Sequence, residues 1–274
     1  MTRALVFDSG VGGLSVLDAI VAAGLEIDLD YAADNAWLPY GLKSDGDLQR
    51  RVPALIAALV RQWAPDAVVL ACNTASTIAL GQVRSAVSIP VVGVVPPIKP
   101  AAAQTKTGTI GLLATPATVE RAYTADLIAQ FAPRAEVVRF GSAALVAAAE
   151  AKLAGQPPDP AAFSEAIAGL FSAPGGEAID VVALACTHFP LLAQELAAAA
   201  PQPCIWLDSG AAIARRLAEV SGARYGAARL RRAGFTAPDA ARRLYPAFHA
   251  RGFSVLAHIG ADFDVSAIPH LGSA

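Results

Sequence analysis

Short, uninterrupted apolar segments alternate along this chain with longer segments whose apolar residues recur at helical spacing. Apolar segments without polar alternation are typical of strands that are buried on both faces of a parallel sheet. Strands separated by helices indicate βαβ units, so the sequence predicts an α/β fold with mainly parallel sheets. We predict strands at residues 4–7, 30–33, 67–71, 91–95, 109–113, 136–140, 181–185 and 205–207. We predict helices at residues 14–23, 48–63, 119–131, 143–153, 163–171, 191–199 and 211–220.

Two proline-containing segments suggest where the chain passes between domains. The 274 residues suit one large domain or two domains of moderate size. Prolines cluster at residues 90–100 and again at 201–203. We therefore predict a discontinuous first domain, residues 1–97 plus 208–274, and a second domain, residues 98–207. The segment AVVLACNTAS is similar to VVALACTHFP, and FDSGVGG is similar to LDSGAA, so we expect two related, pseudo-symmetric halves that face each other.

The charge balance argues against nucleic acid and membrane partners. Lys and Arg number 21 against 23 Asp and Glu, and the isoelectric point is about 6.1, so there is no basic footprint. The sequence contains no clean apolar run of about 20 residues, and its N-terminus turns polar too early for a signal peptide. Three cysteines are too few for a disulfide scaffold, which predicts a reducing, cytoplasmic environment.

Two of the cysteines occupy matching positions. Cys72 and Cys186 each follow a predicted buried strand and precede helical sequence. Ligands of parallel α/β sheets bind outside the carboxyl ends of strands, and a following helix N-terminus is expected to lower the pKa of a thiol. A lone cysteine is more often a small buried hydrophobe, but two in matching contexts favour chemistry. Cys204 has no such context and is predicted to lie in the core.

Further polar groups surround the first strand and the second cysteine. The segment DSGVGG, from Asp8, does not match the dinucleotide fingerprint, yet its glycines and the following helix suit an anion; a simple tight turn is the alternative. Asp8 suits either a helix cap or a proton acceptor. The turn Pro39-Tyr40-Gly41 is consistent with a rigid loop.

Histidine supplies a second candidate for proton transfer. His188 lies two residues from Cys186, where acid–base chemistry competes with an ordinary hydrogen-bonded role. A zinc site built from Asp8, Cys72, Cys186 and His188 lacks any C-x-x-C or H-x-x-x-H spacing, so we expect no metal. The remaining histidines lie in a C-terminal segment without a recognisable pattern: His249, His258 and His270.

Five motifs together resemble the glutamate racemase family of the cofactor-independent Asp/Glu racemase superfamily. They are FDSGVGGLSVL, DNAWLPYGLKS, ACNTAS, IGLLATPATV and ACTHFPLL, and they occur in the family's order over most of the chain. The resemblance implies two α/β domains with the active site in the cleft between them. It implies that Cys72 and Cys186 are the catalytic thiols, with Asp8 assisting Cys72 and His188 assisting Cys186. The implied substrate contacts are Asp8, Ser9, Pro39, Tyr40, Gly41, Asn73, Thr74, Thr115, Thr118, Glu150, Thr187 and His188.

The resemblance also implies an activity. It is the interconversion of L- and D-glutamate by two-base proton transfer at Cα, catalysed by an isomerase without a cofactor, which supplies D-glutamate for peptidoglycan synthesis. The resemblance further implies a cytoplasmic homodimer with glutamate as its small-molecule partner. Three alternatives remain open: a racemase of aspartate or another amino acid, a cysteine hydrolase using Cys186 and His188, and a non-catalytic anion-binding or redox-sensing protein.

Overall fold

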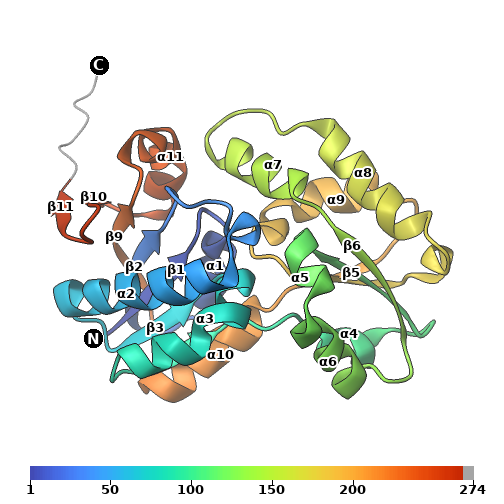
Figure 1. The fold of residues 1–274 in the computed structure, drawn as a ribbon, viewed down its shortest axis with the longest axis horizontal. Coiled ribbons are helices and arrows are strands. Elements are labelled where there is room, and N and C mark those ends of the chain that lie inside the picture. Colours follow the sequence, from blue (N-terminus) through green and yellow to red (C-terminus); the bar gives the residue numbers. More distant parts are fainter. Residues whose placement is uncertain (268–274) are drawn as a thin grey trace.

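A computed structural model describes residues 1–267 of the chain and arranges its strands in two sheets (Figure 1). The larger sheet has the strand order β11-β10-β9-β2-β1-β3-β4, and the smaller has the order β6-β5-β7-β8. Among the described strands, every pairing is parallel except that of β10 with β11. The predicted α/β class with mainly parallel sheets is thereby confirmed.

The larger sheet and its helices contain both ends of the described chain. Its strands are β1 (Thr2–Asp8), β2 (Ile27–Ala33), β3 (Ala67–Leu70), β4 (Val91–Gly93), β9 (Arg229–Phe235), β10 (Val255–Ile259) and β11 (Val265–Ala267). The helices that pack on this sheet are α1 (Gly13–Ala22), α2 (Asp45–Trp63), α3 (Asn73–Ala86), α10 (Gly210–Ser221) and α11 (Pro238–Arg251). A short 3₁₀ helix, η1 (Tyr40–Leu42), precedes α2.

The smaller sheet is built from the middle of the chain. Its strands are β5 (Thr109–Ala114), β6 (Glu136–Gly141), β7 (Val181–Leu184) and β8 (Ile205–Leu207). Its α-helices are α4 (Ile98–Gln104), α5 (Pro116–Glu120), α6 (Ala122–Phe131), α7 (Ala144–Leu153), α8 (Pro160–Phe171) and α9 (Ala193–Ala199). Two 3₁₀ helices complete it, η2 (Gly176–Ala178) and η3 (Phe189–Leu192). The division into domains 1–97 plus 208–274 and 98–207 remains our proposal, and residues 268–274 lie outside the described residues.

Both faces of the larger sheet are buried, which explains the unbroken apolar strands. Successive strand residues point to opposite faces. In β1, Val6 belongs to the core beneath α1, α10 and α11, whereas Leu5 and Phe7 belong to the core beneath α2 and α3. Two further apolar clusters cover the smaller sheet in the same way. None of the described helices is long and apolar enough to cross a membrane.

The C-terminal segment is the largest departure from the sequence prediction. Residues for which no element was predicted form β9, α11, β10 and β11, which extend the larger sheet beyond β2. The apolar signal is weak in β9 because three of its first four residues are arginines. Two of them, Arg229 and Arg232, form ion pairs with Asp28 and Asp30 of β2. His249 and His258 lie in α11 and β10, whereas His270 lies outside the described residues.

One predicted helix, residues 119–131, is two helices. Thr115 caps α5 by accepting a hydrogen bond from the backbone N–H of Thr118. The chain then turns at Arg121, whose extended backbone separates α5 from α6. The Arg121 guanidinium donates two hydrogen bonds, of 2.9 and 2.8 Å, to the carboxylate of Asp45 at the start of α2. This ion pair joins the elements of the two sheets, which local helical spacing does not reveal.

Candidate active site

The carboxyl ends of strands from both sheets meet at one small cavity. Cys72 and Cys186, each two residues after the end of its strand, β3 or β7, both line it. Its volume is about 20 Å³, room for about one water molecule. The complete lining is Ser9, Leu38, Pro39, Tyr40, Gly41, Cys72, Asn73, Thr74, Thr115, Val146, Ala185, Cys186, Thr187 and His188.

Cys72 is buried beside a carboxylate. Its sulfur lies 3.9 Å from the hydroxyl oxygen of Ser9, and its side chain is only 6% exposed. Burial and the negative charge of Asp8 raise the pKa of the Cys72 thiol well above its ordinary value. The expectation that a helix N-terminus lowers this pKa is therefore wrong for Cys72, because desolvation and a neighbouring carboxylate outweigh the helix.

Asp8 both caps a helix and faces the thiol. Its Oδ2 accepts a hydrogen bond of 2.9 Å from the backbone N–H of Gly13, at the start of α1. Its Oδ1 has no hydrogen-bond partner among the described residues. Burial raises the pKa of Asp8, although His188 and the hydrogen bond from Gly13 oppose this shift. A Cβ on Gly13 would lie 2.9 Å from the Cβ of Asp8, so glycine allows this close approach.

The second thiol has a different partner. The sulfur of Cys186 lies 3.8 Å from Nδ1 of His188, and Nε2 of His188 lies 2.8 Å from Oε1 of Glu150. Burial lowers the pKa of His188, but its hydrogen bonds to Cys186 and Glu150 and the charges of these groups raise it well above its ordinary value overall. A protonated imidazole here stabilises negative charge on the neighbouring sulfur. The two thiols therefore have carboxylate and imidazole neighbours respectively.

The glycine-rich segment after β1 makes room for these groups. A Cβ on Gly12 would clash with the ring of His188. The backbone N–H of Val11 donates a hydrogen bond of 2.8 Å to Oε1 of Glu150, the same oxygen that contacts His188. We predicted that these glycines suit an anion, with a tight turn as the alternative. In the structure they allow the loop after β1 to pack against His188 and Glu150.

Three of the predicted substrate contacts stand behind the cavity lining. Asp8 and Thr118 are fully buried, and neither lines the cavity. The Thr118 hydroxyl lies 2.8 Å from the hydroxyl of Thr115, so Thr118 supports a lining residue. Glu150 reaches the cavity only through His188. In this arrangement the three side chains lie behind the lining, and their contact with substrate stays a prediction.

The remaining predicted residues line the cavity, and they differ in whether their polar atoms already have hydrogen-bond partners. Asn73 is 5% exposed, and its Oδ1 has no hydrogen-bond partner among the described residues. The hydroxyl of Tyr40 instead donates to Oδ2 of Asp34 at 2.7 Å. Sequence reasoning missed the apolar lining residues, Leu38, Val146 and Ala185, because aliphatic side chains carry no chemical signal.

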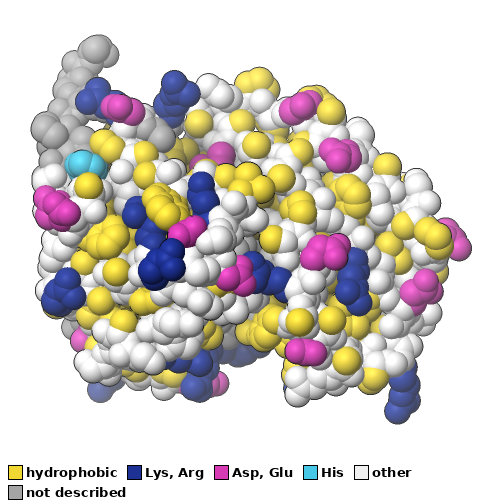
Figure 2. Space-filling view, in the orientation of Figure 1, with side chains coloured by type: hydrophobic (Ala, Val, Ile, Leu, Met, Phe, Trp, Pro, Cys, Tyr) yellow, Lys and Arg dark blue, Asp and Glu magenta, His cyan; other side chains and the backbone are white. Residues whose placement is uncertain are grey.

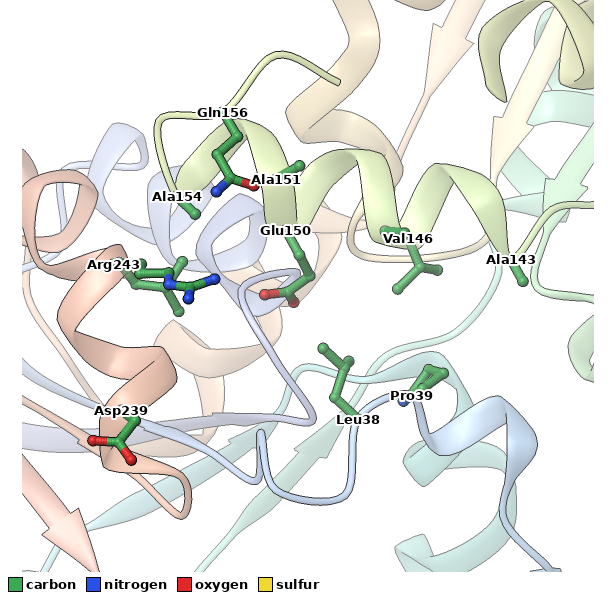
Figure 3. Close-up of a pocket in the computed structure, with 12 residues that line it drawn as sticks. Leu38, Pro39, Ala143, Val146, Glu150, Ala151, Ala154, Gln156, Asp239 and Arg243 are labelled. Atoms are coloured by element: carbon green, nitrogen blue, oxygen red, sulfur yellow. The ribbon is translucent and has the colours of Figure 1, made fainter. Parts of the chain in front are cut away.

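A larger hollow adjoins the cavity. It has a volume of about 620 Å³ and lies between α7, α11 and the loop that contains Leu38 and Pro39 (Figure 3). Figure 3 shows Glu150 of α7 and Arg243 of α11 pointing into it from opposite sides. Its lining residues are Leu38, Pro39, Ala143, Val146, Ala147, Glu150, Ala151, Ala154, Gln156, Asp239, Arg243 and Leu244. Leu38, Pro39 and Val146 line both spaces and form the wall between them.

The sequence of the chain is similar to those of known racemases. Residues 13–217 match the family model described as Asp/Glu/Hydantoin racemase. The chain belongs to this racemase family. It is 53% identical to a glutamate racemase of Sphingopyxis alaskensis over 79% of this chain and 81% of the relative. It is 49% identical to a glutamate racemase of Pectobacterium carotovorum over 78% and 74%.

A solved structure of this racemase family has a closely similar fold. The Escherichia coli glutamate racemase, crystallised with L-glutamate and the activator UDP-MurNAc-Ala, superposes with a TM-score of 0.87 at 40% identity. The similarity covers 97% of this chain and 99% of that one.

On the face of the described residues in Figure 2, basic and acidic side chains are interspersed, which agrees with the absence of a basic footprint in the sequence.

Proposed function

We propose that this member of the racemase family is a glutamate racemase that interconverts L- and D-glutamate. The observation that carries the proposal is the pair of buried thiols, Cys72 and Cys186, which reach one cavity from two different sheets. Inversion at Cα needs a base on one face of the carbon and an acid on the other. Two thiols with separate partners meet this need, and both of the relatives described above are named glutamate racemases.

The two thiols differ in the proton state that their surroundings favour. Burial and Asp8 hold Cys72 as a thiol, which can donate a proton. The ring of His188, whose pKa is raised, lies 3.8 Å from the sulfur of Cys186, and when protonated it can stabilise a thiolate that accepts a proton. These proton states are the ones that the reaction of L-glutamate requires: Cys186 removes the Cα proton, and Cys72 delivers a proton to the other face. With D-glutamate the roles reverse, and Asp8 takes the proton of Cys72 while His188 supplies one to Cys186.

Polar lining residues would hold the substrate between the thiols. The hydroxyls of Ser9, Thr74 and Thr187 and the amide of Asn73 surround the cavity. Removing the Cα proton moves charge onto the α-carboxylate, and fixed hydrogen bonds that strengthen with this charge lower the barrier. This chemistry uses side chains of the chain itself. Because the cavity is far smaller than a ligand pocket of a few hundred Å³, we infer that the two halves separate to admit glutamate.

The biological setting is part of the same proposal. We infer that the product D-glutamate serves peptidoglycan synthesis and that the enzyme acts in the cytoplasm as a homodimer. The support for this setting is the family resemblance, together with three cysteines that are all free thiols. Size-exclusion chromatography with light scattering tests the assembly, and a mass of one chain would contradict the dimer.

Racemisation can be tested directly on the purified, reduced protein. Solutions of L-glutamate and of D-glutamate in deuterated water should each lose their circular dichroism, and mass spectrometry should find deuterium at Cα. Loss of optical activity with glutamate but not aspartate would support the proposed substrate. Activity with aspartate alone would transfer the proposal to that amino acid. A covalent acyl-enzyme trapped by hydroxylamine, without racemisation, would instead favour hydrolysis.

The Glu150–His188 pair predicts a shift in the pH dependence of this reaction. Glu150 raises the pKa of His188, and His188 is protonated below its pKa. In Glu150→Gln this support is lost, so His188 loses its proton at lower pH. We expect the alkaline fall of kcat/KM to move down by about one pH unit or more, the size of a lost neighbouring charge. The profile is measured by circular dichroism over a pH series.

A second glutamate provides the control for this experiment. Glu195, on α9, pairs with Lys152 of α7 and does not contact His188. Glu195→Gln should leave the alkaline limb in place. An unchanged alkaline limb in Glu150→Gln would remove Glu150 from the proposed role.

A further inference from the structure

The segment between β2 and α2 forms one edge of the cavity and is anchored by a buried carboxylate. Pro39, Tyr40 and Gly41 line the cavity from this segment. Asp34, the first residue after β2, is fully buried. Its backbone N–H donates a hydrogen bond of 2.9 Å to the carbonyl of Asp8. Asp34 therefore lies where the cavity edge leaves the sheet.

Four hydrogen bonds saturate the Asp34 carboxylate. Arg51 of α2 donates two of them, from Nε at 2.7 Å and from Nη2 at 2.8 Å. The Tyr40 hydroxyl donates a third at 2.7 Å, and the Thr236 hydroxyl donates a fourth at 2.9 Å. Burial and the adjacent carboxylate raise the pKa of Tyr40 well above its ordinary value, so its hydroxyl remains a donor. Asp34 thus ties a cavity residue to α2 and to the C-terminal segment.

Arg51 is itself held between aromatic rings. Its guanidinium carbon lies 4.5 Å from the ring centre of Trp37 and 5.3 Å from that of Phe263. Such stacking favours a fixed guanidinium plane, which a bidentate pair with a carboxylate requires. Trp37 belongs to the segment that lines the cavity, and Phe263 precedes β11. The connection between β10 and β11 therefore helps to orient the arginine that orients Asp34.

The junction between β9 and α11 also supports the segment. The Thr236 hydroxyl accepts a hydrogen bond of 3.0 Å from the backbone N–H of Ala36. Asn35 exchanges two hydrogen bonds with the backbone of Ala237, of 2.8 and 3.1 Å. These contacts join residues about 200 positions apart in the chain. They bring residues 236 and 237 next to the site, a position that the local sequence does not indicate.

We propose that Asp34 is a positioning residue that fixes the Pro39–Gly41 edge of the substrate cavity by holding Tyr40, with Arg51 and Thr236 setting its own orientation. The inference rests on the proposed racemase function. Asp34 does not line the cavity, so its effect on substrate is through Tyr40. A cavity edge that contacts the ligand equally strongly in the ground and transition states contributes uniform binding, so displacing it raises KM. Loss of a group that moves protons lowers kcat instead.

Asp28 provides a comparison near the start of β2, the strand that Asp34 directly follows. It is also a buried carboxylate of β2 with two hydrogen bonds, both of 2.8 Å, from an arginine of β9, Arg229. It lies near the start of β2, at the opposite end of the strand from the cavity. A purely structural role predicts similar effects of substitution at Asp28 and Asp34, whereas positioning predicts an effect on KM at Asp34 alone.

The decisive experiment compares Asp34→Asn with Asp28→Asn in the racemisation assay. An amide cannot accept from Arg51 and Tyr40 as a carboxylate does, so we expect Asp34→Asn to raise KM for both enantiomers by about tenfold. Its kcat should change much less, and Asp28→Asn should leave KM unchanged. A wild-type protein without activity would refute the proposed function. An active wild type with an unchanged KM in Asp34→Asn would refute the positioning role.

Two further measurements keep the inference testable if Asp34→Asn fails to fold. Thr236→Val removes one donor to Asp34 and should raise KM, but by less than Asp34→Asn does. Thr236→Ser keeps the hydroxyl and should have the KM of the wild type. Hydrogen exchange followed by mass spectrometry should show faster exchange in residues 35–43 of Thr236→Val, without any substrate present. Equal KM and equal exchange in the valine and serine variants would overturn the inference.

Discussion

Serine in place of Cys72 or of Cys186 is expected to lower the rate of glutamate racemisation by about 10³-fold or more, with either enantiomer as substrate. The physical reason is that each thiol is proposed to carry one of the two proton transfers, and positioned acid–base groups contribute about 10² to 10⁴-fold. A serine hydroxyl fills nearly the same space but is a far weaker acid than a thiol. Both directions must suffer, because inversion needs both faces of Cα. Circular dichroism decay of L- and D-glutamate measures the loss.

Cys204 supplies the control for the two serine variants. Its sulfur lies 3.4 Å from the carbonyl of Ile179, and the residue packs against the core of the smaller sheet. It does not line the cavity. Cys204→Ser should therefore retain racemisation, which separates loss of a catalytic thiol from loss of any thiol. Substantial activity in either Cys72→Ser or Cys186→Ser would exclude the two-thiol mechanism.

The strands that lead to the site could be predicted because they are apolar and buried on both faces. The strand predicted at 205–207 has the bounds of β8, and the one predicted at 109–113 extends by one residue in β5. Both cysteines follow strands that are buried on two faces, so the pattern placed them at the carboxyl ends of their sheets. Local periodicity was sufficient here because these strands have no charged residues to obscure it.

Elsewhere the deciding interactions join residues that are distant in the sequence. The apolar pattern of β9 is interrupted by arginines whose charges are balanced only by aspartates of β2. The pKa of Cys72 is raised by burial and by Asp8, and this carboxylate belongs to β1, far from the thiol in the sequence. Asp34 likewise gains its significance from Arg51 and Thr236. Contacts between charged groups that are distant in the sequence form only in the folded chain, so local patterns do not reveal them.

Asparagine in place of Asp8 is expected to lower kcat/KM for glutamate by about 10²-fold, the lower range for loss of a general base. The fall must be equal for both enantiomers, because L- and D-glutamate have equal free energy and the equilibrium constant is unity. The separate changes in kcat and in KM need not be equal for the two enantiomers. Since Asp8 is proposed to take the proton of Cys72, kcat with D-glutamate should fall further than kcat with L-glutamate, and KM should compensate. Initial rates measured from each enantiomer give both constants.

His188→Asn completes the comparison because His188 lies beside the other thiol, 3.8 Å from the sulfur of Cys186. It should show the opposite asymmetry, with kcat for L-glutamate falling further, since Cys186 then lacks the imidazolium that favours its negative charge. An asparagine at position 8 can still accept the hydrogen bond from Gly13 that Asp8 accepts now, so the start of α1 should be preserved. Thermal unfolding of the variants tests this point. If both variants showed the same asymmetry, the pairing of Asp8 with Cys72 and of His188 with Cys186 would be wrong.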